Sequence, residues 1–259
     1  MPGVVDRLIT HIKNESITPR GILMIGAMAD LLPLSQVEKI SQLLSSPFLN
    51  SFGSTETGIP PCSGSMLKFD AESFSLSKTQ NSLCVVKLVD ENDEEVAVGI
   101  PGEMAVRGPT LFSGYWNAEE ANLTDFRNGW FHMGDIFRRN ENSTFDFVDR
   151  AKYLIKSGGE NIYPAEIERV LLSDERIVEA VVVKRSDPLW GEVPVAVIAC
   201  ATLPMTEEQV FEICRPNLAG FKQPKQVVFC SLDDFPRSTT GKILRHEIEE
   251  LVEQKYSKS

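Results

Sequence analysis

The sequence contains few of the residues that bind transition metals or form disulfides. Its three histidines and five cysteines are scattered over 259 residues, and no two cysteines have the short spacing of a zinc site. The spacing therefore predicts neither a metal cluster nor a disulfide framework. Unpaired thiols are typical of a reducing compartment, so we expect a cytoplasmic protein.

Long apolar runs and an excess of positive charge are also missing. A helix that crosses a bilayer needs about 20 apolar residues, and no segment comes near that length. The first residues, MPGVVDRLITHIKNES, lack the apolar core of a secretory signal. Because 26 basic residues face 37 acidic ones, giving a net charge of −11, non-specific binding to nucleic acid is disfavoured. We expect no transmembrane segment and no nucleic-acid partner.

The first part of the chain predicts a piece of a parallel α/β layer. GILMIGA (21–27) is a short apolar run typical of a strand buried on both faces, and PFLNSFGSTETG (47–58) indicates a second buried strand that runs into a polar loop. The segment 36–44 between them has the pattern of a helix, and this order favours parallel pairing. Parallel sheets bind ligands beyond the carboxyl ends of their strands. Gly26 and the turn 53–56 therefore mark a candidate nucleotide site.

The pattern changes after this layer. Residues 83–148 contain short strands and turns, which predicts a small antiparallel barrel or sheet. Within it, GWFHMGD (129–135) is interpreted as delivering Asp135 at a turn. Residues 59–82 are rich in Ser, Pro and Lys, and no element is predicted for them.

A charged joint follows in the stretch DRAKYLIKSGGENIYPAEIE (149–168). It combines charged residues, an apolar pair, a flexible Gly–Gly pair and a proline that suits the first turn of a helix. This combination indicates a domain boundary that also touches a ligand, and the alternative is a plain surface loop before a helix. Residues 150–259 then interleave helices and strands, which predicts a small α+β domain. They carry a net charge of −2 against −9 for residues 1–149, so cations are relatively concentrated where an anionic substrate would be met.

Two turns carry groups that suit a nucleotide. FGSTETG (52–58) offers an aromatic ring, hydroxyls and Glu56; rings stack on purines, and carboxylates bind Mg²⁺. A polar turn after a strand has the same composition. Asp135 can accept two bonds from a ribose diol, although a turn aspartate is more often a cap or turn-former.

A lysine-bearing loop lies near the end of the chain. PRSTTGKILR (236–245) presents Lys242 after a Ser/Thr/Gly loop and before a helix. A Walker motif is excluded because Pro236 and Ile243 stand where it needs Gly and Ser or Thr. Lys242 can still pair with a carboxylate or phosphate as a point charge, and a solvated loop lysine is the alternative.

Taken together and in this order, six segments resemble the signature motifs of the adenylate-forming superfamily: FGSTETG, GEMAVRG…GYW, GWFHMGD, DRAKYLIKSGGENIYPAEIE, WGEVPVAVI and STTGK. That superfamily contains acyl- and aryl-CoA synthetases, luciferases and peptide-synthetase adenylation domains. The form SGGENIYPAEIE is most similar to ligases for fatty or related carboxylic acids. The resemblance implies a two-step reaction with Mg²⁺: a carboxylate and ATP give acyl-AMP and pyrophosphate, and coenzyme A then forms the thioester.

The resemblance also implies domains and roles. Residues 1–149 would be the C-terminal portion of a large domain, with an α/β piece (1–60) and a β-rich subdomain (83–148). Residues 150–259 would be a small mobile domain, hinged near 149–152. The implied site residues are Lys242, Thr55 and Glu56 for catalysis, with Glu56 on the metal; Gly26, Phe52, Gly53, Asp135 and Arg150 for the nucleotide; Lys152 at the hinge; and Ser157, Gly158 and Gly159 for coenzyme A.

The family's phosphate-binding loop has no counterpart in the sequence. That Ser/Thr/Gly-rich segment belongs well upstream of GILMIGA, and nothing before Gly21 can supply it. We therefore expect the C-terminal half of an acid–CoA ligase, with a small carboxylic acid, ATP and CoA as partners and a complementing N-terminal half. The alternatives are an inactive nucleotide- or CoA-binding module, and an adenylation domain that serves a carrier protein.

Overall fold

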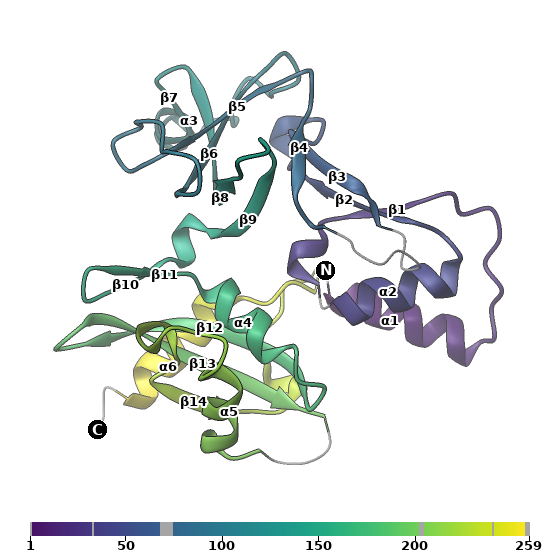
Figure 1. The fold of residues 1–259 in the computed structure, drawn as a ribbon, viewed down its shortest axis with the longest axis vertical. Coiled ribbons are helices and arrows are strands. Elements are labelled where there is room, and N and C mark those ends of the chain that lie inside the picture. The colour runs from purple at the N-terminus through teal and green to yellow at the C-terminus, as the bar shows by residue number, and fades with distance from the viewer. Residues whose placement is uncertain (1, 33, 68–74, 202–204, 240, 257–259) are drawn as a thin grey trace. The chain divides into compact units, whose positions relative to one another are not determined.

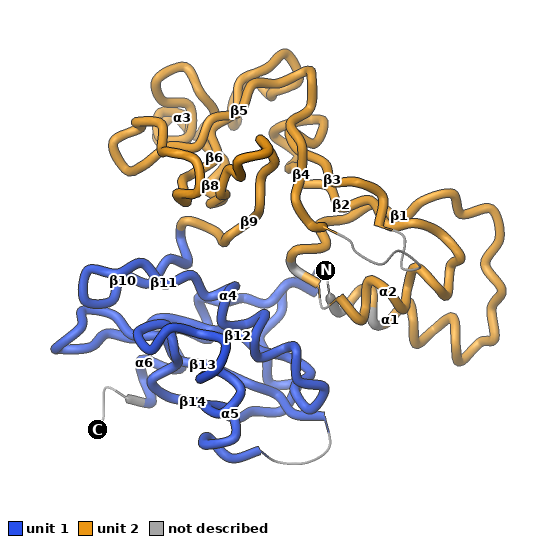
Figure 2. Tube along the Cα trace, viewed as in Figure 1, with its two compact units in different colours: residues 1, 152–259 blue, residues 2–151 orange. Residues whose placement is uncertain are grey.

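The computed structural model describes residues 2–32, 34–67, 75–201, 205–239 and 241–256. The chain forms two compact units, one comprising residues 2–151 and the other beginning at Lys152 (Figures 1 and 2). No helix among the described residues is long and apolar enough to cross a membrane.

The first unit opens with the predicted strand–helix–strand arrangement. Strands β1 (Ile25–Ala27) and β2 (Phe48–Phe52) pair in parallel, with helix α2 (Leu34–Leu44) between them in sequence and helix α1 (Pro2–Asn14) before them. Apolar side chains of all four elements pack into one cluster around Phe48, which is fully buried. The carboxyl ends of β1 and β2 therefore lie beside each other, as the sequence predicted.

Two further strands occupy the segment for which the sequence predicted no element. Strand β3 (Cys62–Leu67) pairs with β2, and β4 (Lys78–Gln80) pairs with β3. The side chain of Lys78 is fully buried, and its Nζ lies 2.6 Å from Asp30 Oδ2. The ion pair offsets part of the cost of burying a charge.

The β-rich region is antiparallel, as predicted. It contains β5 (Val85–Val89), β6 (Pro101–Arg107), β7 (Phe126–Arg127), β8 (Trp130–Arg139), β9 (Phe145–Arg150) and the short helix α3 (Glu119–Asp125). The strand order is β1-β2-β3-β4-β9-β8-β6-β5, with β7 beside β8. The bridge Lys78↔Phe145 joins the α/β strands to this region, and Phe137 lies at the centre of its apolar core.

The second unit has the mixed composition predicted for it. Its elements are β10 (Ile155–Ser157), β11 (Glu160–Ile162), α4 (Pro164–Leu171), β12 (Ile177–Asp187), β13 (Gly191–Cys200), α5 (Glu207–Cys214), β14 (Gln226–Phe229) and α6 (Arg245–Tyr256). The sheet runs β11-β10-β13-β12, and β14 pairs with β13. Thr206 caps α5 by accepting a hydrogen bond from Gln209 N–H.

Helices cover both faces of this second sheet. Alternate residues of β12 point to opposite sides: Val182 packs with α4 and α5, whereas Val181 and Val183 pack with α6. Because both faces are buried, β12 contains a continuous apolar run rather than alternating apolar and polar residues. The sheet is a rigid base for the loops and turns at its edges.

Candidate functional site

The polar turn after β2 carries three of the predicted site residues. Thr55 and Glu56 lie in a single 3₁₀ turn, and Gly53 precedes it. A Cβ on Gly53 would stand 2.9 Å from Pro60 Cα, so the close packing of the turn requires glycine there. Thr55 is exposed, which leaves its hydroxyl available to a phosphate oxygen. Gly26, at the neighbouring end of β1, is exposed and has open space where a side chain would be.

Phe52 does not present an open stacking surface. Its side chain is 4% exposed and belongs to the apolar core of the β-rich region. Its ring centroid lies 4.6 Å from that of Phe137 in an edge-to-face arrangement. This burial counts against the predicted stacking on adenine, because the ring already has an aromatic partner.

The carboxylate of Glu56 is held by the segment that follows β6. Tyr115 donates its hydroxyl to Glu56 Oε1 at 3.1 Å, and Phe112 N–H donates to the Glu56 carbonyl at 2.9 Å. A hydrogen bond from Ser54 lowers the pKa of Glu56 most, and Tyr115 and the charge of Arg150 lower it further. Burial, with the nearby Glu56 carboxylate, raises the pKa of Tyr115 to about 12, so the phenol stays a donor.

The oxygen atoms of Glu56 and Thr55 are suitable ligands for the predicted magnesium ion. Mg²⁺ prefers oxygen ligands and is often held by one or two carboxylates together with substrate phosphates. Glu56 offers an ionised, partly exposed carboxylate beside the Thr55 hydroxyl. No group of three or more His, Cys, Asp and Glu side chains suited to a metal occurs among the described residues, so phosphate oxygens would complete the shell.

The shift of Glu56 predicts a pH dependence of stability. Its folded pKa lies below the ordinary value of 4.5, so its contribution is fully present above that pH and is lost as the pH falls through the folded pKa. Glu56→Gln is expected to lower the free energy of unfolding at neutral pH and to cost less near pH ~3. Urea denaturation at both pH values measures this.

A matched control for that experiment is Glu141→Gln, which removes an exposed carboxylate from the β8–β9 turn of the same unit. The control is expected to change stability little at either pH. A Glu56→Gln effect of equal size at neutral and acid pH would contradict the expectation.

Asp135 and Arg150 face each other across the β8–β9 ladder. They are direct partners in the register, and Arg150 Nε lies 3.2 Å from Asp135 Oδ1. Asp135 is 5% exposed, whereas about half of the Arg150 side chain is exposed. The prediction that Asp135 lies at a turn is wrong, because β8 continues through it to Arg139. Gly134, the glycine before Asp135, adopts a φ of +69° within the strand.

The charge of Arg150 links these two parts of the site. It pairs with Asp135 and also lowers the pKa of Glu56. Within the first unit, the structure therefore brings together the ionised carboxylate of Glu56 from the turn after β2, the cation of Arg150 from β9 and the carboxylate of Asp135 from β8. Such a set can bind phosphate, Mg²⁺ and hydroxyl groups.

The Gly–Gly pair of the second unit lies in a tight hairpin rather than in an open loop. Strands β10 and β11 pair from Ser157↔Glu160, so Gly158 and Gly159 are its two turn residues, both with positive φ. That geometry is typical of a type I′ turn, which glycine favours. Gly158 N–H donates to the Trp190 carbonyl at 2.8 Å. Ser157 is 8% exposed, whereas both glycines are exposed.

The two glycines are expected to differ in their tolerance of a side chain. A Cβ on Gly158 would stand 2.7 Å from the indole of Trp190, whereas Gly159 has open space around it. Gly159→Ala is expected to cost about 1 kcal/mol for the backbone alone, and Gly158→Ala about 2–4 kcal/mol because the clash adds to it. Thermal denaturation of both variants measures the difference, and equal costs would contradict the Trp190 contact.

Lys152 and Lys242 both lie in the second unit. Lys152 is exposed in the 3₁₀ turn Ala151–Tyr153, with its Nζ 5.0 Å from the Tyr153 ring centroid. Lys242 is exposed beside Gly241, and its main chain is held by Ser238: Ser238 N–H donates to the Lys242 carbonyl at 2.8 Å. The exposed Lys242 side chain therefore extends from main chain that is hydrogen-bonded to Ser238.

Sequence reasoning missed the residues that hold this site. Tyr115 and Glu103 belong to the segment 102–116, in which the sequence predicted no site residue. Trp190 covers the hairpin at Gly158. Their partners are distant in sequence, so no local pattern indicates these contacts.

Two family models match the chain. The model described as AMP-binding enzyme matches residues 1–116, and that described as AMP-binding enzyme C-terminal domain matches residues 166–242. A curated 2-succinylbenzoate–CoA ligase of Bacillus cereus is 39% identical over 209 residues. The chain belongs to the AMP-binding, adenylate-forming enzyme family.

The match spans 80% of this chain but 42% of the Bacillus cereus relative, so the chain spans about half the length of the curated relatives it matches. Solved structures of the same family are also similar to this chain. The o-succinylbenzoate CoA synthetase of Bacillus subtilis, in complex with an acyl-adenylate intermediate, has a TM-score of 0.75 at 30% identity over 95% of this chain and 53% of that one. Its complex with ATP and magnesium ion has a TM-score of 0.74 at 29% identity, over 94% and 54%.

Proposed function

We propose that this chain supplies the nucleotide-binding edge and the small mobile domain of an ATP-dependent, AMP-forming acid–CoA ligase. The observation that carries the proposal is the set Glu56, Asp135 and Arg150, which lies together in one unit and bears charges that suit ATP and Mg²⁺. The similarity to ligases with ATP, magnesium and acyl-adenylate complexes supports it.

In the first step, a carboxylate oxygen of the acid attacks the α-phosphorus of ATP, and the bond to pyrophosphate breaks. Asp135 and Arg150 hold the ribose, and the Thr55 hydroxyl donates to an α-phosphate oxygen. Glu56 holds Mg²⁺, which neutralises phosphate charge when bound. Lys242 bridges the carboxylate and phosphate oxygens, where negative charge shifts as the bond forms.

In the second step, the thiolate of coenzyme A attacks the acyl carbon, and the carbon–oxygen bond to AMP breaks. The hairpin at Ser157, Gly158 and Gly159 faces the thiol-bearing arm, because exposed backbone without side chains lets it approach closely. Lys152 lies at the start of the second unit. A hinge at this position would let Lys242 act in the first step and the hairpin in the second.

The proposed acid is a small carboxylic acid. The first candidate is 2-succinylbenzoate, because the names of the relatives given above identify it as their substrate. The fatty acids suggested by SGGENIYPAEIE have no specific support among those relatives. We place the chain in the cytoplasm, where ATP and coenzyme A are supplied.

The proposal is tested by incubating the chain with ATP, Mg²⁺, coenzyme A and each acid of a panel that includes 2-succinylbenzoate and fatty acids. Mass spectrometry then detects acyl-AMP and acyl-CoA, and calorimetry measures ATP binding. Acid-dependent acyl-AMP and acyl-CoA support the proposal. ATP binding without either product, also when the chain is extended by its upstream coding sequence, would indicate an inactive binding module and overturn it.

A further inference from the structure

Strand β8 departs from regular pairing beside the candidate site. On β6 the partners step from Glu103↔Ile136 to Ala105↔His132, so residues 133–135 of β8 lie opposite a single residue of β6. Bulges of this kind re-aim side chains and are frequent near active sites. Here the residue that follows the bulge glycine, Gly134, is Asp135, the partner of Arg150.

The carboxylate of Glu103 occupies the bulge. Its Oε1 accepts a hydrogen bond from Gly134 N–H at 3.0 Å. In a regular ladder that N–H would have a carbonyl of the neighbouring strand as its partner. The Glu103 side chain therefore replaces a missing ladder bond immediately before Asp135, and an unsatisfied buried N–H would cost free energy.

The other oxygen of Glu103 is held by two nitrogen groups. Arg127 Nη2 donates to Oε2 at 2.8 Å, and His132 Nδ1 lies 3.2 Å from the same oxygen. Burial by itself raises the pKa of Glu103, but the hydrogen bonds from His132 and Arg127 outweigh it, and the pKa lies below its ordinary value. The carboxylate that supports the bulge is thus ionised and fixed in direction.

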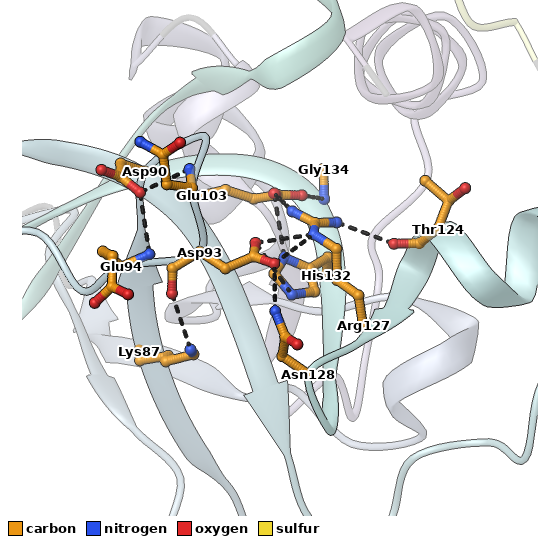
Figure 3. A network of polar contacts seen from close by, with 11 residues as sticks. Lys87, Asp90, Asp93, Glu94, Glu103, Thr124, Arg127, Asn128, His132 and Gly134 are labelled. Atoms are coloured by element: carbon orange, nitrogen blue, oxygen red, sulfur yellow. Dashed lines mark hydrogen bonds and ion pairs between the residues drawn. The ribbon is translucent and has the colours of Figure 1, made fainter.

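Arg127 is itself held by Asp93, which lies in a loop distant in sequence. Its Nε lies 2.8 Å from Asp93 Oδ1, and its Nη1 donates to the Thr124 carbonyl at 3.0 Å (Figure 3). Asn128 donates to the other oxygen of Asp93 at 2.8 Å. These contacts tie the turn after β5 and the end of α3 to Arg127, and Glu103 links Arg127 to the bulge.

We propose that Glu103 is a positioning residue of the nucleotide site: by holding the Gly134 bulge of β8, it keeps Asp135 facing Arg150. The inference rests on the proposed function only in that Asp135 and Arg150 bind the ribose. Glu103 acts through the backbone and does not touch the nucleotide.

The test is the variant Glu103→Gln, which keeps the size of the side chain and removes its charge. The NH₂ group of the glutamine, itself a donor, must then face either the Gly134 N–H or the nitrogens of Arg127 and His132. We expect hydrogen exchange at the Gly134 amide to accelerate about tenfold or more and the dissociation constant for ATP to rise roughly 5–30-fold. Nuclear magnetic resonance and calorimetry measure these on the whole chain.

Two further variants separate positioning from general stability. Glu95→Gln also removes a carboxylate that pairs with an arginine of β8, Arg139 at 2.9 Å, but its side chain is half-exposed and away from the bulge; it should change neither readout. In an Asp135→Asn background, Glu103→Gln should weaken ATP binding no further, because Glu103 acts through Asp135. If Glu103→Gln does not fold, Arg127→Gln weakens the same carboxylate more mildly and should shift both readouts in the same direction.

An unchanged Gly134 amide in a folded Glu103→Gln, or an equal loss of ATP affinity with and without Asp135, would overturn the inference. If neither the wild-type chain nor the chain extended by its upstream coding sequence binds ATP, the proposed function fails, whereas the exchange rate at Gly134 and the carboxyl carbon shift of Asp135 still show whether Glu103 positions this segment.

Discussion

Lys242→Ala lowers the rate of acyl-AMP formation by roughly 10²–10³-fold, because the alanine leaves no cation where charge develops between the acid and the α-phosphate. The expected loss of stability is small, since the Lys242 side chain is exposed and its turn is held by backbone contacts with Ser238. Rapid-quench measurement of acyl-AMP, in the preparation that supports adenylation, gives the rate.

The matched control is Lys225→Ala, which removes another exposed lysine of the same unit. It changes the net charge equally and should leave the rate within about twofold, as distant surface charges are screened. Adenylation by Lys242→Ala at the wild-type rate would remove this lysine from the mechanism, and an equal loss in Lys225→Ala would point to a general charge effect.

Asp135→Asn is expected to raise the dissociation constant for ATP by roughly 10–100-fold, because hydrogen bonds to charged groups are the stronger ones in a binding site. The substitution keeps the shape of the side chain but removes the charge that faces Arg150, 3.2 Å away. It also replaces one of two acceptor oxygens for the ribose with a donor. Calorimetric titration with ATP measures the change.

Glu141→Gln again serves as the control, since it removes an exposed carboxylate from the turn that joins β8 to β9. ATP affinity should remain within about twofold of the wild type. Wild-type affinity in a folded Asp135→Asn variant would show that Asp135 does not bind the ribose, whatever the rest of the site does.

The ordered motifs predicted the family, and local patterns predicted most elements. The apolar runs that became β1 and β2 follow from chemistry within a few residues of each position. Strands β3 and β4 were not predicted, because a polar, glycine-containing segment forms β3 and a buried lysine opens β4. Their partners, β2 and β9, supply the context that the local sequence lacks.

The local geometry around several candidate site residues differs from what the sequence suggested. Gly134 suggested a turn at Asp135, whereas a bulge supported from β6 lets the strand continue. The pair Gly158 and Gly159 suggested an open loop, whereas Trp190 covers a two-residue hairpin turn. Phe52 was expected to be open to adenine and instead packs against Phe137. Each difference depends on a partner far away in sequence.

Acid-dependent exchange of pyrophosphate into ATP is the measurement that tests the central claim most directly, because it reports reversible formation of acyl-AMP without coenzyme A. We expect exchange with a carboxylic acid from the panel, by the chain alone or extended by its upstream coding sequence, and its loss in Lys242→Ala. Absence of exchange in both preparations with every acid, although ATP binds, would contradict the assignment of adenylation to this site.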